Sequence, residues 1–254
     1  MRIVTWNVLS GRAPSDGEAD VARLAQCCKS LDADVLGLQE VDRCLTRSES
    51  VDQAAAVADA IGAVDYRFVP ALYGTPGETW RPASEADPGG PAYGIALFSR
   101  LPVTSWRVLR LPQAPKVGLP MPVPGSRRWR WIGDEPRVAV CARVRAPFGE
   151  VTVAATHLSF VPAWNAWQLR RVVAQLRRLP GPYVLMGDLN IPGQLPRLFA
   201  HWRCLARGGT FPAHAPHAQL DHVLASPGLE FASTSYEIRE MALSDHRAVV
   251  VEVT

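Results

Sequence analysis

The chain has 254 residues, of which 48% are hydrophobic and 20% are charged, proportions typical of a folded globular protein and not of a disordered one. A formal net charge of +3 at pH 7 is too small to indicate a polyanionic partner by itself. No apolar run approaches the roughly 20 residues of a membrane-spanning helix, so stable membrane insertion is not expected.

The cysteines indicate a reducing compartment. Five are present, an odd number without the spacing of a metal site, and we interpret them all as free thiols. The chain enters a predicted strand at once and shows no secretory signal. We therefore expect a cytoplasmic protein, and we expect it to be a monomer.

Strands and helices alternate in the first part of the chain. The pattern predicts strands at 2–8 and 35–38 and helices at 18–31 and 51–61, the second of which ends at Gly62. Strands then dominate, and they are predicted at 66–72, 93–99, 103–111, 137–145 and 150–157.

A third helix is predicted at 164–179. Its expected inner face carries Trp164, Trp167, Val173 and Leu176. Further strands are predicted at 182–187, 220–225, 234–239 and 247–253.

The Pro- and Gly-containing stretch 112–133 is interpreted as a long loop within one domain, because regular elements continue on both sides of it. The order of elements predicts a single α/β domain over residues 1–254, with mixed sheets.

Polar side chains interrupt the apolar strands near their ends. The strand-end residues are Asn7, Glu40, His157, Asp188, Asn190, Asp221, Asp245 and His246. In α/β sheets, strand ends meet along one edge, where functional sites form. Carboxylate and amide oxygens suit Mg²⁺, and an Asp beside a His makes an oriented general base. His222 follows Asp221 in the strand and points to the opposite face, so we expect a structural role for it.

Seven segments occur in an order that resembles the endonuclease/exonuclease/phosphatase superfamily. They are Thr5-Trp6-Asn7, Leu38-Gln39-Glu40-Val41-Asp42, the stretch 93–100, Thr156-His157-Leu158, Gly187-Asp188-Leu189-Asn190, the stretch 220–224 and Ser244-Asp245-His246-Arg247. The resemblance covers essentially the whole chain. It implies a four-layer α/β sandwich, in which two mixed sheets pack face to face with helices outside.

The resemblance also implies roles for the strand-end residues. Glu40 is the expected main ligand of Mg²⁺, or alternatively Mn²⁺, supported by Asn7 and Asp245. His246, oriented by Asp221, is expected to activate water or stabilise the transition state. The remaining expected groups are Asp188 as a second acid or base, and Asn190 and His157 as hydrogen-bond donors to the phosphate.

Two positions depart from the exonuclease III-like branch of the superfamily. Leu9 stands where those enzymes commonly carry an acidic residue, and His157 stands where they tend to have tyrosine. Both favour the deoxyribonuclease, sphingomyelinase and phosphatase side.

Three functions stay open. The leading hypothesis is a phosphodiesterase that acts on nucleic acid, DNA or RNA, by metal-assisted attack of water on phosphorus. The second is a phosphatase or phospholipase-type enzyme that acts on an inositol phosphate, a sphingolipid or another small phosphate ester. The third is an inactive binding module on the same fold, against which the intact set of strand-end residues argues.

Basic and aromatic residues inside the 112–133 loop are a predicted substrate arm. They are Arg127, Arg128, Trp129, Arg130 and Trp131. Guanidinium groups would contact phosphates and indoles would stack on bases, although the same residues also suit a lipid headgroup surface or a purely structural loop. Arg137, at the start of the following strand, is a further predicted phosphate ligand.

Overall fold

Two mixed β-sheets form the framework of the protein, whose computed structural model describes residues 1–114, 119–122 and 129–254. The first sheet has seven strands, in the spatial order β14 (Thr234–Arg239), β15 (Ala248–Val253), β1 (Arg2–Asn7), β2 (Val35–Arg43), β5 (Ala92–Ser99), β3 (Asp65–Gly74) and β4 (Trp80–Pro82). The second has six strands, in the order β12 (Arg203–Cys204), β13 (Asp221–Ala225), β11 (Tyr183–Asp188), β10 (Gly149–His157), β9 (Arg137–Ala146) and β6 (Val103–Leu111).

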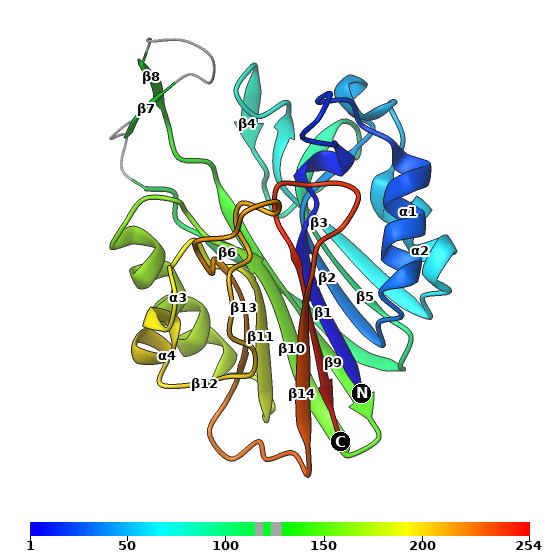
Figure 1. Ribbon diagram of the computed structural model, residues 1–254, viewed down its shortest axis with the longest axis vertical. Helices are drawn as coiled ribbons and strands as arrows, with labels where there is room; N and C mark the ends of the chain where they lie inside the picture. Colours follow the sequence, from blue (N-terminus) through cyan, green and yellow to red (C-terminus); the bar gives the residue numbers. More distant parts are fainter. Residues whose placement is uncertain (115–118, 123–128) are drawn as a thin grey trace.

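The two sheets pack face to face and helices cover their outer faces (Figure 1). A valine-rich core lies between the sheets, with residues such as Val140, Val153 and Val249 fully buried. The outer face of the seven-stranded sheet is covered by α1 (Val21–Ser30) and α2 (Gln53–Ile61), and that of the six-stranded sheet by α3 (Trp164–Leu176) and α4 (Leu195–Ala200). The predicted four-layer sandwich is confirmed.

Local signals in the sequence fix the ends of the first two helices. The Asp20 carboxylate accepts a hydrogen bond from Arg23 N at 2.8 Å at the start of α1, and Asp52 does the same for Ala55 N at 3.0 Å at the start of α2. Gly62 ends α2 in a left-handed conformation with φ 65°, as predicted.

The inner face predicted for the third helix was partly wrong. Val173 and Leu176 are buried, but Trp167 is 39% exposed and Trp164 is half-buried. The two indoles stack on each other with ring centroids 4.6 Å apart. The buried stripe of α3 consists of smaller apolar residues together with two polar ones, and the large indoles lie at its border.

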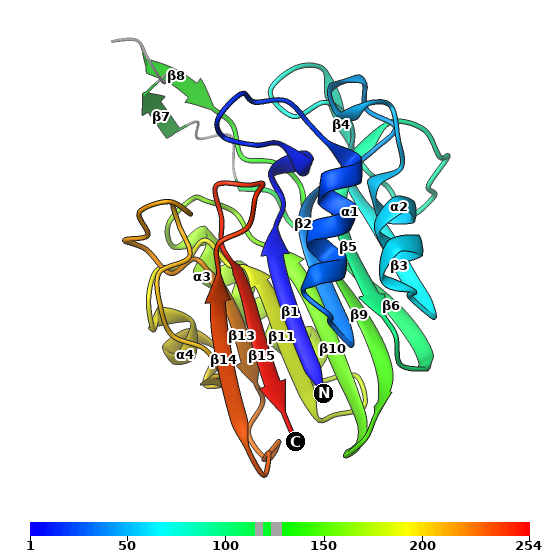
Figure 2. The same ribbon diagram turned by 45° about the vertical axis from the view of Figure 1, so that its right-hand side comes forward.

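Several short elements were not predicted, among them β4, β12, α4 and the two 3₁₀ turns η1 (Leu9–Gly11) and η2 (Thr46–Ser48). The predicted loop 112–133 contains two strands, β7 (Leu119–Pro122) and β8 (Trp129–Ile132), which pair in antiparallel fashion. They extend beyond one end of the large sheets (Figures 1 and 2). Arg127 and Arg128 of the predicted substrate arm lie outside the described residues, whereas Trp129, Arg130 and Trp131 belong to β8.

All five cysteines are free thiols. Within the described parts of the chain, no helix combines the length and the apolar character needed to cross a membrane.

Candidate active site

The functional strand ends meet at one edge of the sandwich. β10 and β11 are parallel neighbours, and their last residues, His157 and Asp188, lie side by side. β13 runs antiparallel to β11 and begins at this edge, so that Asp221 is the register partner of Asp188. β1 of the other sheet ends here with Asn7. The sheet topology therefore gathers residues that are up to about 240 positions apart.

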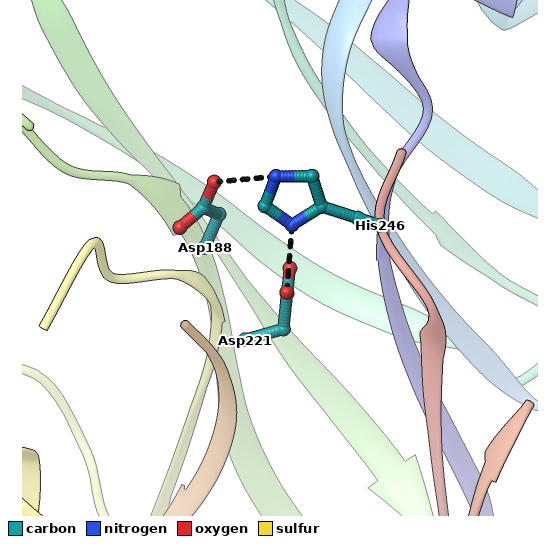
Figure 3. Close-up of side chains that lie close together, drawn as sticks. All are labelled: Asp188, Asp221 and His246. Carbon is teal, nitrogen blue, oxygen red and sulfur yellow. Dashed lines mark hydrogen bonds and ion pairs between the residues drawn. The ribbon is translucent and has the colours of Figure 1, made fainter. Parts of the chain in front are cut away.

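The closest contact of the site joins His246 and Asp221. His246 Nδ1 and Asp221 Oδ2 are 2.8 Å apart, while His246 Nε2 points toward Asp188 Oδ2 at 3.8 Å (Figure 3). Asp221 has no exposed surface, and Thr210 Oγ1 accepts a hydrogen bond from its backbone N–H. The predicted hydrogen bond between these two side chains is thus present, and Nε2 is the ring nitrogen directed away from Asp221.

The loop before β15 holds His246 in place. Trp6 Nε1 donates a hydrogen bond to the His246 carbonyl at 2.9 Å, and His246 N donates to Ser244 Oγ at 3.0 Å. The Phe211 ring packs against the imidazole with centroids 4.9 Å apart. Burial by itself would lower the pKa of His246, but the Asp221 and Asp188 carboxylates outweigh it and raise the pKa of the imidazole.

Asp188 lies at the centre of the site and contacts several of the predicted residues. Its Oδ2 accepts a hydrogen bond from Asn7 Nδ2 at 3.1 Å and is 3.5 Å from His157 Nε2. Its Oδ1 accepts from Asn190 N at 2.9 Å. Burial raises the pKa of Asp188, and the neighbouring Asp221 carboxylate raises it further. Such a carboxyl group is suited to exchange a proton near neutral pH.

Gly187 allows the backbone conformation that places Asp188 at this edge of the sheet. Its φ of +143° lies in a region that side chains disfavour, and a Cβ there would lie 1.9 Å from the Thr156 carbonyl oxygen of β10. The glycine in Gly187-Asp188-Leu189-Asn190 is therefore a backbone requirement, because it lets β11 approach β10 closely just before the edge where these side chains meet.

Asn190 and His157 flank Asp188 in the same cavity. Asn190 Nδ2 donates to the Leu158 carbonyl at 3.0 Å, and the Asn190 carbonyl accepts from Asn165 Nδ2 at 2.7 Å, so the residue is fixed from both sides. Burial lowers the pKa of His157 well below its ordinary value, and the Arg137 charge lowers it further. His157 is consequently a neutral donor or acceptor.

The seven-stranded sheet contributes Glu40 by an irregularity in β2. The register between β2 and β5 shifts between Gln39 and Val41, and Glu40 takes a left-handed φ of 58°. Such a bulge re-aims a side chain, and the Glu40 carboxylate faces the cavity, where it accepts a hydrogen bond from Asn7 Nδ2 at 3.0 Å. β2 extends beyond the predicted 35–38, because its pairing with β5 continues past this bulge to Arg43.

The predicted metal ligands suit a divalent cation. In the described part of the chain, Asp245 Oδ1 is buried without a hydrogen-bond partner. Burial raises the pKa of Glu40, the Asn7 hydrogen bond partly offsets this, and the nearby Glu135 and Asp245 carboxylates add to it. A cation bound by oxygen atoms would relieve both the unpartnered oxygen and the repulsion.

A second compact group lies next to these residues, since Asn7 Nδ2 donates to both Glu40 Oε1 and Asp188 Oδ2. One ligand-type atom each from Asp188, Asp221 and His246 falls within 4.8 Å of the others, close enough to hold an ion. In this group His246 Nδ1 and Asp221 Oδ2 are hydrogen-bonded to each other, whereas Asp221 Oδ1 is buried without a hydrogen-bond partner among the described residues.

A cavity of about 610 Å³ connects the two halves of the site. It is lined by Glu40, Asp188, Asn190, His157 and His246, all predicted from the sequence, and by residues that were not: Arg12, Arg47, Glu78, Trp80, Tyr93, Glu135 and Phe160. Glu78 and Trp80 come from the β3–β4 hairpin, whose three-residue strand has no periodicity to detect. Arg47 is fixed at the wall by two hydrogen bonds to the buried Asp42.

Arg137 lies in the wall of the cavity with an incomplete set of partners. The residue is 4% exposed, and in the described part of the chain its Nε has no hydrogen-bond partner. Two carboxylates lie near it but beyond hydrogen-bond distance: Nη2 is 3.6 Å from Glu135 Oε2 and 3.8 Å from Asp134 Oδ1. A buried guanidinium whose Nε has no hydrogen-bond partner among the described residues is suited to bind an anion.

Comparison with solved structures supports the same fold. A protein described as an endonuclease/exonuclease/phosphatase from Beutenbergia cavernae DSM 12333 superposes with a TM-score of 0.72 at 24% identity, over 100% of this chain and 71% of that one. A mannosyl-6-phosphatase from Bacteroides thetaiotaomicron VPI-5482 gives 0.64 at 19%, over 100% and 99%. Sphingomyelinase C from Streptomyces griseocarneus gives 0.61 at 14%, over 99% and 98%.

Sequence comparison identifies the family. No curated protein gives a significant match, but the sequence model of the endonuclease/exonuclease/phosphatase family matches residues 4–246. This range includes every strand-end residue described above, from Asn7 to His246. The chain belongs to the endonuclease/exonuclease/phosphatase family.

Proposed function

We propose that this protein is a magnesium-dependent phosphoesterase that hydrolyses a small phosphate ester. The observation that carries the proposal is the buried Asp221–His246 pair at 2.8 Å, whose outer nitrogen faces Asp188 across the cavity. An oriented imidazole opposite a carboxyl group with a raised pKa is an arrangement for moving protons to and from water and a leaving group.

Each residue has a distinct task in this proposal. Asp221 fixes the ring of His246 and supports its charge, so that Nε2 is the position that gives or takes a proton. Asp188 holds a proton at Oδ2 or removes one from water. Asn190, His157 and Arg137 surround the phosphate oxygens with donors, which offsets the charge that gathers on phosphorus.

Glu40, Asn7 and Asp245 would hold the Mg²⁺ ion. When bound there, the ion would supply a positive charge that polarises the phosphate and stabilises the charge of the transition state. Glu40 has the strongest claim to direct ligation, because its carboxylate faces the cavity and the bulge in β2 directs it there.

The shape and charge of the cavity support a small substrate. A volume of about 610 Å³ is of the size that encloses a small organic ligand. The β3–β4 hairpin supplies Glu78 and Trp80 to one wall, and Glu135 adds a further carboxylate. The same lining also carries Arg12, Arg47 and Arg137, so its charge is mixed and does not form the continuous basic surface of a nucleic-acid groove. Two structurally similar proteins are a mannosyl-6-phosphatase and a sphingomyelinase C, which is in keeping with an ester of this size.

A nucleic acid is the second candidate substrate, and one observation favours it. The β7–β8 hairpin extends past the catalytic edge and carries Trp129, Arg130 and Trp131 in β8 (Figure 2). An arm of this composition beside a phosphate site is suited to contact a polynucleotide.

A substrate panel with metal add-back tests the proposal. The purified protein, stripped with EDTA, should be inactive and should recover with Mg²⁺ against p-nitrophenyl phosphate, bis-p-nitrophenyl phosphate, sugar phosphates, inositol phosphates, sphingomyelin, plasmid DNA or RNA. We expect turnover of small esters to exceed that of DNA and RNA. No hydrolysis of any substrate with Mg²⁺ or Mn²⁺, or full activity in Asp221→Asn, would reject the proposal.

The arm can be tested separately. Replacing Arg127, Arg128 and Arg130 with Ala should leave bis-p-nitrophenyl phosphate hydrolysis intact under either candidate. If the substrate is nucleic acid, the same variant should lose DNA affinity, and its salt dependence should flatten by roughly 0.7–0.9 log units per lost contact in a log–log plot.

A further inference from the structure

A second hollow lies at the end of the six-stranded sheet that is remote from the catalytic edge. It has a volume of about 740 Å³ and is formed by α4, β12 and the turn after β13. β13 starts with Asp221 at the catalytic edge and ends at Ala225, next to Arg203 of β12. At about 3.3 Å per residue, the strand separates the two places by roughly 13 Å. Figure 1 shows α4 and β12 far from β7 and β8.

Three arginines line this hollow without carboxylate partners. Arg197, Arg203 and Arg207 are all exposed, and in the described part of the chain none of them forms an ion pair. Other exposed arginines, such as Arg107 and Arg170, also have no ion pair among the described residues, so what distinguishes these three is that they line one hollow.

One of the three guanidiniums is held in position. Arg203 Nη2 donates to the Leu229 carbonyl at 3.3 Å, and its guanidinium lies over the Phe231 ring at 5.9 Å. These contacts fix the planar group but use only part of its five N–H donors. A pre-positioned guanidinium loses less side-chain entropy when it binds an anion.

The other two arginines line the same hollow as Cys204. Burial raises the pKa of the Cys204 thiol, and the charges of Arg207 and Arg197 act to lower it. Both arginine side chains are exposed, so a ligand can reach their guanidiniums from solvent.

The remaining lining residues define the kind of ligand. Glu230 is the one carboxylate among the lining residues of the hollow, against the three arginines and His201. Leu229 and Trp202, both buried, form its apolar floor. Planar guanidiniums bind phosphate in a bidentate manner. The hollow thus combines phosphate recognition with room for a larger organic group.

We propose that the hollow formed by Arg197, Arg203 and Arg207 is a second, non-catalytic site that binds a phosphate group. The ligand is either a free phosphate compound or the phosphate headgroup of a lipid. The site is separate from the catalytic cavity, so its occupancy does not require the phosphate to be hydrolysed, and the proposal stands whatever the substrate of the enzyme is.

Nuclear magnetic resonance can report on both sites in one titration. Inorganic phosphate added to the ¹⁵N-labelled protein without metal should shift the amides of Cys204, Gly228 and Leu229, independently of those of Gly187 and Asn190. In Arg197→Ala/Arg207→Ala, the dissociation constant from the first set should rise at least about tenfold, because charge-assisted hydrogen bonds are the stronger class. The shifts of the second set should not change.

Two further variants serve as controls. Arg23→Ala/Arg107→Ala removes the same charge from exposed arginines of α1 and β6 and should leave phosphate binding at the hollow unchanged. Arg197→Lys/Arg207→Lys keeps the charge and should retain weaker binding. Equal binding in the alanine double variant, or an equal loss in the Arg23/Arg107 control, overturns the proposal.

Vesicles distinguish the two sources of phosphate. Sedimentation with vesicles of phosphatidylcholine containing phosphatidic acid should retain the wild type but not Arg197→Ala/Arg207→Ala if the ligand is a lipid headgroup, with pure phosphatidylcholine as the control. Phosphate-induced shifts without vesicle binding assign a free phosphate compound. Absence of both, in a protein whose spectrum shows it to be folded, rejects the site.

Discussion

The two sheets contribute different chemistry to one cavity. The seven-stranded sheet and its loops supply Asn7, Glu40 and Asp245, the proposed metal ligands, whereas the six-stranded sheet supplies His157, Asp188 and Asp221, which we propose handle protons and phosphate oxygens. The exception is His246, which precedes β15 of the first sheet but is hydrogen-bonded to Asp221 of the second. The proposed metal side and the proposed proton side are therefore joined through one imidazole.

The site therefore depends on the packing of the two sheets against each other, as well as on the residues at the end of each strand. Gly37 of β2 shows how close that packing is, because a Cβ there would lie 2.8 Å from Met186 Cε of β11. If the two sheets have separate roles, substitutions on one side should affect metal binding and those on the other should affect turnover.

The proton side should show the largest loss. Asp221→Asn keeps the shape of a fully buried residue but no longer holds the imidazole of His246 in the same charge state. We expect kcat to fall by roughly 10³–10⁴, the scale seen when the carboxylate of an Asp–His pair is replaced in a hydrolase. Mg²⁺ affinity, measured by calorimetry, should stay at the wild-type value, and a parallel loss of metal binding would break the division between the sheets.

A substitution on the proposed metal side should weaken Mg²⁺ binding, unlike Asp221→Asn. Glu40→Gln removes the charge that would hold Mg²⁺, so calorimetry should show weaker metal binding. Activity at a fixed Mg²⁺ concentration should fall by at least roughly a hundredfold, which is more than the loss expected for a residue that contacts a metal ligand but not the metal itself. Raising the Mg²⁺ concentration should restore part of it. Unchanged Mg²⁺ affinity in this variant would show that Glu40 is not a ligand.

Arg137 should give an intermediate effect that falls on substrate recognition. Losing one hydrogen bond to a charged group costs about 1.5–3 kcal/mol, so Arg137→Ala should lower kcat/KM by about 10–100-fold. Arg137→Lys should recover only part, because an ammonium group cannot form the bidentate contact. Since Arg137 is buried, the melting temperature of both variants is the necessary control. A full rescue by Lys would argue for a general charge effect.

His222 should affect stability and leave chemistry alone. It points away from the Asp221 side, and its Nε2 contacts the Ile191 carbonyl at 2.9 Å. Burial lowers its pKa to about 4 from an ordinary value of 6.5. Between these values the unfolded chain binds more protons than the folded one, so stability is complete above pH 6.5 and decreases by up to about 3 kcal/mol as pH falls toward 4.

Chemical unfolding across this pH range checks the assignment. His222→Asn should flatten the slope of the free energy of unfolding between pH 6.5 and 4, although it is less stable than the wild type at neutral pH. Its kcat per folded molecule should remain near the wild-type value. A slope that is identical to that of the wild type would show that other groups control the acid sensitivity.

The sequence was most informative where short motifs coincide with strand ends. Asp221 and His246 were predicted to be hydrogen-bonded across 25 positions, and Asp188 was predicted to lie opposite them; the structure places all three together. These predictions succeeded because a strand end has few directions in which its side chain can point. The structural role expected for His222 followed from the same alternation and agrees with its buried contacts.

Other parts of the cavity could not be predicted because they depend on the tertiary arrangement of irregular segments. Glu78 and Trp80 reach the site from a hairpin that no hydrophobic period marks. The correct position of Glu40 was expected, but its left-handed φ of 58° arises from pairing with β5 and leaves no trace in its own sequence. Trp164 and Trp167 matched a helical stripe, yet the size of an indole favours the border of that stripe over its centre.

The pairing of β1 with β15 has a consequence for protein synthesis. These strands are antiparallel neighbours, with Thr5 opposite Val249, and Trp6 Nε1 donates to the His246 carbonyl across 240 positions. On the ribosome, the nascent chain releases β1 first and must keep its apolar residues unpaired on one side until β15 emerges. Such long-range closure slows folding. Before residues 246–253 emerge, the growing polypeptide lacks both His246 and the β15 partner of β1, so the site cannot assemble until then.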